Sequence, residues 1–325
     1  MSALLSVEGL TKHFPVTRGV VFQSKVGMVR AVDGISFDVA PGETLALVGE
    51  SGCGKSTTGR MILRLLEASA GTIRFEGKDV RALPRGALRD LRRDMQIIFQ
   101  DPYASLNPRL TVGQALAEPL RLHKLASGEK LRLRIDELLT EVGLSAWHTL
   151  RYPHEFSGGQ RQRIGIARAL ASEPKLIVCD EPVSALDVSI RAQILNLLED
   201  MKARFGLTLL FIAHDLAVVK SVSDRVAVMY LGRLCEVADS ASLFATPAHP
   251  YTAALMAAIP VPDPDIPLGD TKLKPGDPPS PLDPPSGCRF RTRCPHAEAR
   301  CTTEVPPLRE IAAGREVACH FPLIG

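Results

Sequence analysis

The stretch Gly49-Glu50-Ser51-Gly52-Cys53-Gly54-Lys55-Ser56 fits the pattern G-x-x-x-x-G-K-[ST] and decides the fold class of this chain. An apolar, β-prone run over Thr44–Val48 leads into it. After it, apolar residues recur at helical spacing at Met61, Ile62, Leu65 and Leu66. The pattern therefore predicts a buried strand, a glycine-rich loop and a helix, which is the α/β context in which such a loop binds a polyphosphate.

The residues of this loop have separate chemical roles. Its three glycines let backbone N–H groups point toward a polyphosphate, and the helix N-terminus adds a partial positive charge. We expect Lys55 to contact the β- and γ-phosphates of a nucleotide as a point charge. The Ser56 hydroxyl is placed to coordinate Mg²⁺, and Thr57 is placed to donate a further hydrogen bond to phosphate.

A second apolar strand is predicted at Leu176-Ile177-Val178-Cys179, and it delivers Asp180 and Glu181 at its carboxyl end. In a doubly wound sheet this end lies beside the loop that follows the first strand. Asp180 can hold the Mg²⁺ shell, and Glu181 can accept a proton from an attacking water. Together with the glycine-rich loop, the two carboxylates indicate a nucleotide-hydrolysing site.

The segment Ser157-Gly158-Gly159-Gln160-Arg161 precedes a predicted helix that runs through Ala171. Its serine and glycines offer a hydroxyl and bare backbone amides at a helix N-terminus, which makes a second anion site. With the two earlier motifs, this segment resembles the signature of the ATP-binding subunits of ABC transporters. The resemblance implies an ABC-type P-loop ATPase core with an antiparallel β-subdomain and a helical subdomain, and it implies ATP and Mg²⁺ as ligands.

The same resemblance assigns roles to further residues. Gln100 matches the glutamine loop, whose side chain contacts Mg²⁺ and the attacking water, and Ser184-Ala185-Leu186-Asp187 matches the D-loop. His214 matches the switch histidine at the γ-phosphate, and Phe14 takes the place of the aromatic residue that stacks on adenine. The implied catalytic residues are Glu181, His214, Gln100 and Lys55. The implied nucleotide-binding residues are Phe14, Gly49, Ser51, Gly52, Cys53, Gly54, Lys55, Ser56, Thr57, Gln100, Ser157, Gly158, Gly159, Gln160, Asp187 and His214.

Composition excludes several classes of protein. The formal net charge of +3 over 325 residues does not indicate a nucleic-acid groove, and we expect no nucleic-acid partner. The sequence has no run of eighteen apolar residues and its N-terminus lacks a signal-peptide core, so we expect a cytosolic chain. Its seven cysteines are then expected as reduced thiols or as metal ligands.

The chain divides into three predicted parts. Residues 1–259 would form the ABC ATP-binding domain, with a helical subdomain at about 101–160 that contains helices near 116–120 and 131–142. The resemblance places Tyr103–Val112 nearest to the coupling helix of a permease. Ten prolines lie between Pro260 and Pro285, so residues 260–287 predict an extended tether. Residues 288–325 would form a cysteine-containing extension.

Four of the seven cysteines lie in that extension, at Cys288, Cys294, Cys301 and Cys319, with the spacing C-x₅-C-x₆-C-x₁₇-C. A short segment with few apolar residues needs a staple. Disulfides conflict with the expected compartment, structural zinc usually takes closer cysteine pairs, and iron–sulfur clusters accept looser spacing. A 4Fe–4S cluster, zinc and free thiols all remain open from the spacing alone. The other three cysteines are expected to be inert.

The whole extension resembles the C-terminal region of dipeptide and oligopeptide importer ATPases, on His249-Pro250-Tyr251-Thr252, Pro279-Ser280-Pro281-Leu282 and Val317-Ala318-Cys319. That resemblance implies a 4Fe–4S cluster, with a structural role separate from nucleotide binding. Phe14-Pro15-Val16 and the excursion before Ala31-Val32-Asp33-Gly34 resemble the second ATPase of the heterodimeric pair in such importers.

The resemblance also implies the setting of the protein. Its partners would be a homologous second ATPase, two transmembrane permeases and an extracytoplasmic substrate-binding protein, so the chain would lie on the cytoplasmic side of the inner (plasma) membrane. The implied function is ATP hydrolysis that powers the import of dipeptides or oligopeptides. Importers of nickel or glutathione share the layout, and a soluble non-transport ABC ATPase is a further alternative.

Overall fold

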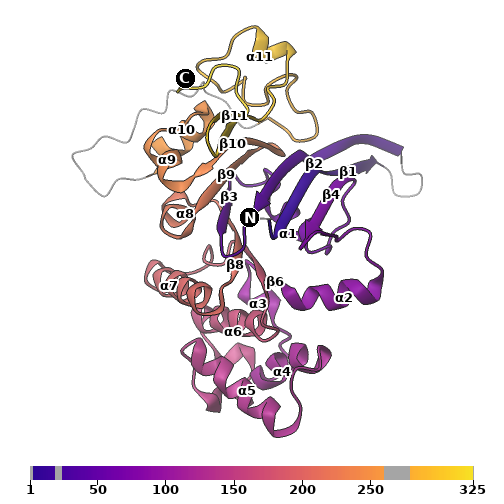
Figure 1. Cartoon of the computed structure of the whole chain (residues 1–325), viewed down its shortest axis with the longest axis vertical. Coiled ribbons are helices and arrows are strands. Elements are labelled where there is room, and N and C mark those ends of the chain that lie inside the picture. The colour runs from indigo at the N-terminus through magenta and orange to yellow at the C-terminus, as the bar shows by residue number, and fades with distance from the viewer. Residues whose placement is uncertain (1–2, 19–23, 260–278, 325) are drawn as a thin grey trace, which may run out of the picture. The chain divides into compact units, whose positions relative to one another are not determined.

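The computed structural model describes residues 3–18, 24–259 and 279–324. The chain divides into two compact units (Figure 1). Unit 1 comprises Met1–Val39, Thr44–Arg81 and Ala213–Gly325, and unit 2 comprises Ala40–Glu43 and Ala82–Ile212. Most of the predicted proline-rich tether, residues 260–278, lies outside the described residues.

An antiparallel sheet forms the N-terminal part of unit 1, in the strand order β2-β1-β4-β5. Its strands are β1 (Leu5–Arg18), β2 (Ser24–Val39), β4 (Ala70–Phe75) and β5 (Lys78–Asp79). Leu5, Val7 and Leu10 of β1 are buried, whereas Glu8 between them is exposed. The sheet therefore has an apolar face and a polar face, and the predicted antiparallel subdomain is confirmed.

A second set of strands in unit 1 carries the phosphate loop. These are β3 (Thr44–Val48), β9 (Arg225–Tyr230), β10 (Arg233–Asp239), β12 (Arg315–Val317) and β11 (Arg309–Ala312). β3 runs parallel to β9, and every residue of β3 is buried, as expected for a strand covered on both faces. β10 pairs with β9 on one edge and with β12 on the other. β12 belongs to residues 279–324, called the C-terminal segment below, so a strand of this segment extends the sheet.

The helices of unit 1 are short: α1 (Lys55–Ile62), α8 (Leu216–Val222), α9 (Ser240–Ala245), α10 (Pro250–Ala257) and α11 (Arg300–Thr303). The helix predicted after Lys55 is confirmed, but it ends at Ile62 and does not include Leu65 or Leu66. Arg64 takes a left-handed φ of 48°, which stops the helix, and Leu65 is exposed. The prediction that this helix continues through Leu65 and Leu66 is therefore wrong.

Unit 2 contains three parallel strands, β6 (Met95–Ile98), β7 (Leu176–Asp180) and β8 (Thr208–Ala213). β7 pairs with both of the others, with Met95 opposite Leu176 and Leu176 opposite Thr208. All five residues of β7 are buried. The strand predicted at Leu176–Cys179 is thus confirmed as β7, which ends at Asp180, directly before Glu181.

The helices of unit 2 are α2 (Arg85–Asp94), α3 (Pro102–Ser105), α4 (Val112–Leu122), α5 (Gly128–Glu141), α6 (Gly158–Leu170) and α7 (Val188–Phe205), with the 3₁₀ turns η1 (Ala146–Leu150) and η2 (Pro153–Glu155). The two helices predicted within the insertion correspond to α4 and α5. The Thr111 hydroxyl accepts the Gln114 N–H while the Gln114 side chain accepts the Thr111 N–H, and this reciprocal cap fixes the start of α4.

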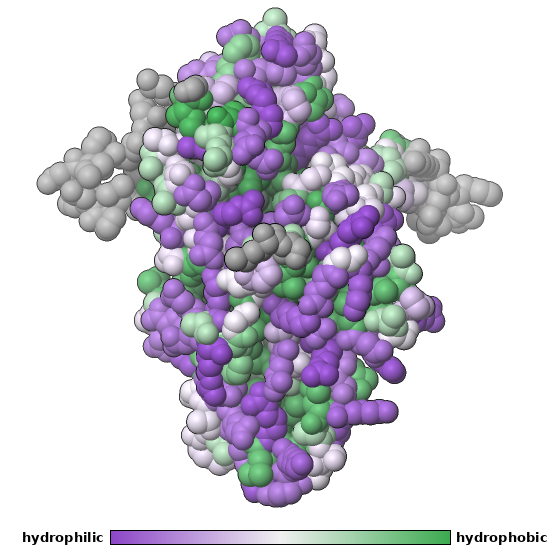
Figure 2. Space-filling model, in the orientation of Figure 1, coloured by the Kyte–Doolittle hydropathy of each residue, from purple (hydrophilic) through white to green (hydrophobic). Residues whose placement is uncertain are grey.

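The surface offers no membrane-spanning element within the described residues, because none of their helices combines the length and the apolar character that a bilayer crossing needs. Figure 2 shows hydrophilic and hydrophobic residues interspersed over the visible face, including its lower part, where α4 and α5 lie.

Candidate functional site

The phosphate loop of unit 1 lies between β3 and α1, as the sequence predicts. Gly54 is the N-cap of α1 with a φ of 109°, and a Cβ there would lie 2.1 Å from the Ala31 carbonyl oxygen. A Cβ on Gly49 would lie 2.1 Å from the Met229 carbonyl oxygen. Only glycine fits either position, because the neighbouring backbone leaves no room for a methyl group.

Lys55 begins α1 and its side chain turns back into the loop. The ammonium Nζ donates to the Gly49 carbonyl at 2.7 Å and to the Glu50 carbonyl at 3.1 Å, and only 4% of Lys55 is exposed. The cation is thus held by two carbonyl groups of the loop that it is expected to serve. A phosphate entering the loop offers Lys55 a charged partner in place of these neutral acceptors.

Phe14 and His214 also belong to unit 1. Phe14 lies on β1 with 36% of its surface exposed, and Lys12 Nζ lies 5.0 Å from the centre of its ring. An exposed ring of this kind is free to stack on a base. His214 is exposed and directly precedes α8, whose N-cap Asp215 accepts hydrogen bonds from the Ala217 and Val218 N–H groups.

Unit 2 brings Gln100 and Glu181 together. The Gln100 side-chain amide donates from Nε2 to Oε2 of Glu181 at 3.0 Å. Glu181 has a left-handed φ of 49°, its N–H donates to the Ile212 carbonyl, and its carbonyl accepts the Ser184 hydroxyl at 3.1 Å. The backbone therefore fixes a carboxylate at the end of β7 in a conformation that costs energy for a non-glycine residue, as often found at functional sites. Asp180, at the end of β7, is buried.

The predicted signature begins α6. The Ser157 hydroxyl accepts the Gln160 N–H at 3.3 Å, and the Gln160 side chain accepts the Ser157 N–H at 3.1 Å. A Cβ on Gly159 would lie 2.5 Å from Cγ2 of Ile190, so α7 packs closely against this glycine. Asp187 is the N-cap residue of α7. The structure thus places a capped helix N-terminus, with two glycine amides in its first turn, where the sequence predicts an anion site.

The exposed side chain of Tyr103 connects α3, the helix that follows Gln100, with α6, the helix that begins at the predicted signature. Tyr103 on α3 is 64% exposed, and the Arg161 guanidinium lies 3.6 Å from the centre of its ring. Arg161 belongs to α6 and donates from Nε to the Pro153 carbonyl at 2.6 Å. This cation–π contact was missed by sequence analysis, because it joins residues that are far apart in the chain.

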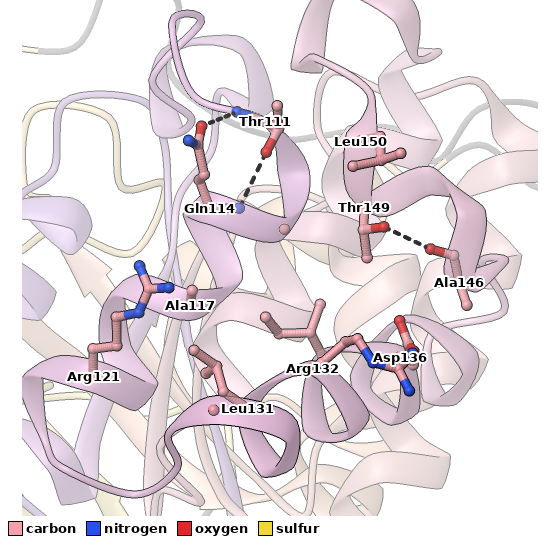
Figure 3. Close-up of a pocket in the computed structure, with 13 residues that line it drawn as sticks. Thr111, Gln114, Ala117, Arg121, Leu131, Arg132, Asp136, Ala146, Thr149 and Leu150 are labelled. Atoms are coloured by element: carbon pink, nitrogen blue, oxygen red, sulfur yellow. Dashed lines mark hydrogen bonds and ion pairs between the residues drawn. The ribbon is translucent and has the colours of Figure 1, made fainter.

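A cavity of about 690 Å³ lies in unit 2 between α4, α5 and η1 (Figure 3). Its lining is mainly apolar, with Ala117, Leu131 and Leu150. Of its three charged residues, Arg132 and Asp136 pair with each other at 3.2 Å, and the third is Arg121. The lining includes no cysteine, histidine or serine. None of the predicted nucleotide-binding or catalytic residues lies in this cavity.

The four C-terminal cysteines lie in one part of unit 1. Cys294, Cys301 and Cys319 are buried, Cys288 is half-buried, and the Cys288 N–H donates to the Cys301 carbonyl at 2.8 Å. Burial, together with the nearby thiols of the other three, raises the pKa of the Cys319 thiol to about 11. A bound cation would reverse this effect by favouring thiolates.

The arrangement of the acidic, histidine and cysteine side chains bears on the predicted metal groups. Among the described residues, no group of three or more histidine, cysteine, aspartate or glutamate side chains is placed to hold a metal ion. The described residues therefore support neither zinc nor a 4Fe–4S cluster at these cysteines, and both stay predictions.

Comparison with known proteins places these features in context. The family described as "ABC transporter" matches residues 32–184, and the family described as "Oligopeptide/dipeptide transporter, C-terminal region" matches residues 235–301. A "probable peptide ABC transporter ATP-binding protein" of Sinorhizobium fredii is 54% identical over 98% of this chain and 90% of its own length. An oligopeptide transport ATP-binding protein of Bacillus subtilis is 50% identical over 98% of this chain and 97% of its own.

A solved structure shows the same fold. A dimeric ATP-binding cassette in a post-hydrolysis state, bound to ADP and Pi, superimposes with a TM-score of 0.64 and 28% identity, covering 73% of this chain and 98% of that one. A cassette from Clostridium perfringens, part of an ABC transporter complex, superimposes with a TM-score of 0.63 over 75% of this chain.

Proposed function

Because the chain belongs to the ATP-binding proteins of ABC transporters, we propose that it hydrolyses ATP to power the import of peptides. The proposal of ATP hydrolysis rests on the phosphate loop, in which Gly49 and Gly54 leave no room for a Cβ and Lys55 is buried. The proposal of peptide import is supported by relatives named for peptide transport, which match this chain almost from end to end. Import of nickel or glutathione by the same machine is the alternative for the cargo.

The ATP site assigns one task to each group of residues. Phe14 stacks on adenine, and the amides of Gly52 and Gly54 with the Lys55 ammonium hold the phosphates. A bound Mg²⁺ would draw charge from the phosphate oxygens, and the oxygen side chains of Ser56, Asp180 and Gln100 are ligands of the type it prefers. These residues fit the ion by donor chemistry.

Hydrolysis is assigned to Glu181. Its carboxylate takes a proton from water, the water oxygen attacks the γ-phosphorus, and the bond to the β-phosphate oxygen breaks to give ADP and phosphate. Gln100 supports this assignment because its amide hydrogen bond orients the Glu181 carboxylate. His214 contacts the γ-phosphate from its exposed position before α8.

A second ATPase completes each site. Ser157, Gly158, Gly159 and Gln160 at the start of α6 bind the γ-phosphate of the ATP that the partner holds, and Asp187 lies at the facing surface. The solved cassette that shares this fold is dimeric, which supports the pairing. We infer a homologous but different partner chain, from the excursion that precedes Ala31.

The permeases bind near α3. Tyr103 supports this assignment because it is exposed, follows Gln100 closely and contacts Arg161 of the signature helix. A permease segment that moves Tyr103 can therefore move both the glutamine loop and the signature. The chain would lie at the cytoplasmic face of the inner membrane, bound to two permeases, with a substrate-binding protein on the other side.

The C-terminal cysteines are proposed to hold a 4Fe–4S cluster that stabilises the segment. Thiolate ligation would add folding free energy to the few apolar contacts of this short segment, such as those of Phe290. Protein purified without oxygen should be brown and contain about four iron and four sulfide per chain. One equivalent of zinc without iron in such protein would overturn the cluster.

The decisive test of the transport function uses the reconstituted complex. Co-purification from detergent-solubilised membranes should recover two permeases and a second ATPase. The complex reconstituted in vesicles should transport labelled oligopeptide only when ATP is present on the side of the membrane that carries the ATPases. Recovery of the chain without any permease would favour the soluble ATPase. Import of nickel or glutathione in place of peptides would correct the cargo.

A further inference from the structure

The C-terminal segment contacts the phosphate loop through one ion pair. Arg293 Nη1 donates to both carboxylate oxygens of Glu50, at 2.9 and 3.0 Å, and 13% of the Arg293 side chain is exposed. Glu50 is the second residue of the phosphate loop, whereas Arg293 directly precedes Cys294. The segment that sequence analysis separated from nucleotide binding therefore contacts the loop that binds the phosphates.

Glu50 is held at three points. Besides the contact with Arg293, its backbone N–H donates to the Tyr251 hydroxyl at 3.0 Å, and its carbonyl accepts from Lys55 at 3.1 Å. When Lys55 turns from this carbonyl to a phosphate, Arg293 and Tyr251 still hold Glu50. The loop can then exchange one internal contact for a ligand without losing its shape, which is the advantage of a preorganised site.

The ion pair also answers an electrostatic problem. The Glu50 carboxylate belongs to a loop whose ligand carries several negative charges, and like charges at close range oppose binding. Arg293 places a compensating cation directly on that carboxylate. Without it, the carboxylate would stand uncompensated beside the bound triphosphate.

A second arginine of the same segment braces the loop from another side. Arg289 donates to the Leu231 carbonyl and to the Asp33 carboxylate. The next residue of that turn, Gly232, donates its N–H to the Cys53 carbonyl of the phosphate loop at 2.9 Å. Arg293 thus contacts the loop directly at Glu50, and Arg289 holds the turn whose Gly232 N–H binds the loop at Cys53.

Aromatic packing fixes the backbone between these arginines. Phe290 is fully buried, and its ring centre lies 5.3 Å from those of both Tyr230 and Tyr251. Tyr251 is the residue whose hydroxyl binds the Glu50 N–H. The same apolar contact therefore orders the C-terminal segment and the tyrosine that holds the loop.

We propose that Arg293 is a positioning residue for ATP binding, which acts by holding and neutralising Glu50 in the phosphate loop. The inference rests on the proposed ATPase function, because it concerns the same loop. It also changes the expectation for the cysteine site: a change that loosens the segment around Cys294 should weaken ATP binding as well.

The test is a double-mutant cycle on the full chain. Equilibrium titration with Mg²⁺–ATP should show Arg293→Ala binding about five- to tenfold more weakly, as for loss of a partly buried charge pair that leaves one charge uncompensated. Glu50→Gln should bind within about twofold of wild type, and Arg293→Ala should add almost nothing to it, because the carboxylate that Arg293 serves is gone. Arg293→Lys should recover most of the affinity.

Two controls separate this inference from the function on which it rests. Arg291 lies in the same segment, and its side chain donates to the carbonyl and the hydroxyl of Ser286. Arg291→Ala should therefore leave ATP affinity unchanged. Lys55→Ala should weaken ATP binding strongly. If Lys55→Ala has no effect, the ATP-site assignment itself fails. If Lys55→Ala weakens binding and Arg293→Ala does not, only the role of Arg293 is wrong.

Further outcomes decide between positioning and simple folding. Arg293→Met keeps the aliphatic stem and removes the charge, so it makes the same test if Arg293→Ala lowers stability. In the assembled transporter, these variants should raise KM for ATP about five- to tenfold with little change in kcat. An equal loss of affinity from Arg293→Met in the Glu50→Gln background would show that Arg293 does not act through Glu50, and would overturn the proposal.

Discussion

The phosphate loop and the C-terminal segment are both poor in regular structure, yet they are shaped in opposite ways. The loop is shaped locally, by glycines at positions such as Gly49 and Gly54 where a methyl group would meet backbone. The C-terminal segment is shaped by remote charges, since Arg289 and Arg315 reach Asp33 and Glu236 in distant parts of unit 1. A motif search finds the first kind of structure and misses the second.

Substitutions in the phosphate loop and in the C-terminal segment should therefore change different measured quantities. Changes in motif residues should alter binding or turnover while leaving the free energy of unfolding nearly constant. Changes in the residues that anchor the C-terminal segment should lower the free energy of unfolding first.

Glu181→Gln should have the largest effect. Glutamine keeps the size of the side chain and an oxygen that can accept the Gln100 amide, but it removes the proton acceptor. Turnover in the assembled complex should therefore fall by about a thousandfold or more, with ATP affinity retained. Single-turnover hydrolysis measures the first and equilibrium titration the second. Glu199→Gln, the same change on the exposed face of α7, should leave both unchanged. Turnover near the wild-type rate would exclude Glu181 as the base.

Glu236→Ala should have the largest effect on stability. The Glu236 carboxylate is fully buried, pairs with Arg315 at 3.1 Å and accepts the N–H groups of Ala248 and His249 at 2.8 Å each. Its loss leaves a buried guanidinium without its carboxylate partner, and the free energy of unfolding should fall by about 3–5 kcal/mol. Chemical denaturation measures this value.

The matched control for Glu236 is Glu310→Ala on β11. Glu310 is exposed, and its carboxylate accepts only the nearby Gly314 N–H among the hydrogen bonds described. The change should cost less than about 1 kcal/mol. If both substitutions cost the same, the buried ion pair does not anchor the segment and the contrast between the two regions is lost.

His249 should make the anchoring of the C-terminal segment sensitive to pH. Burial lowers the pKa of His249 to about 4, so the folded chain binds this proton less readily than the unfolded chain. The resulting stability is fully present above the unfolded pKa of about 6.5 and is lost as pH falls toward 4, by roughly 3 kcal/mol in total. Unfolding measured from pH 7.5 to 4.5 should show this slope, and His249→Gln should reduce it. An unchanged slope in the variant would exclude His249.

Tyr103→Ala should have the smallest effect among these, and it tests the surface of unit 2. Removing the ring removes a cation–π contact worth about 0.5–2 kcal/mol, so ATPase activity stimulated by the permeases should fall a few-fold. Basal ATP binding by the purified chain should not change. A loss that is equal with and without permeases would show that Tyr103 supports folding and not coupling.

The sequence predicted the motif-bearing elements closely. β3, β7 and α6 begin and end within about two residues of the expected positions, because buried parallel strands are continuous apolar runs and α6 starts at a serine cap. The end of α1 was missed, since a left-handed Arg64 stopped the helix within an apolar pattern. The nucleotide roles of the motif residues and the cysteine cluster stay predictions.

By itself the sequence determined the phosphate loop, the acidic strand end and the signature, because each depends on residue types at fixed short spacing. Only the tertiary structure decided which remote side chains meet them: Gln100 on Glu181, Arg161 on Tyr103, and Arg293 on Glu50. A glycine is required by the backbone next to it and can be found from its neighbours. An ion pair between residues 50 and 293 exists only after folding, because nothing near either residue in the chain specifies its partner.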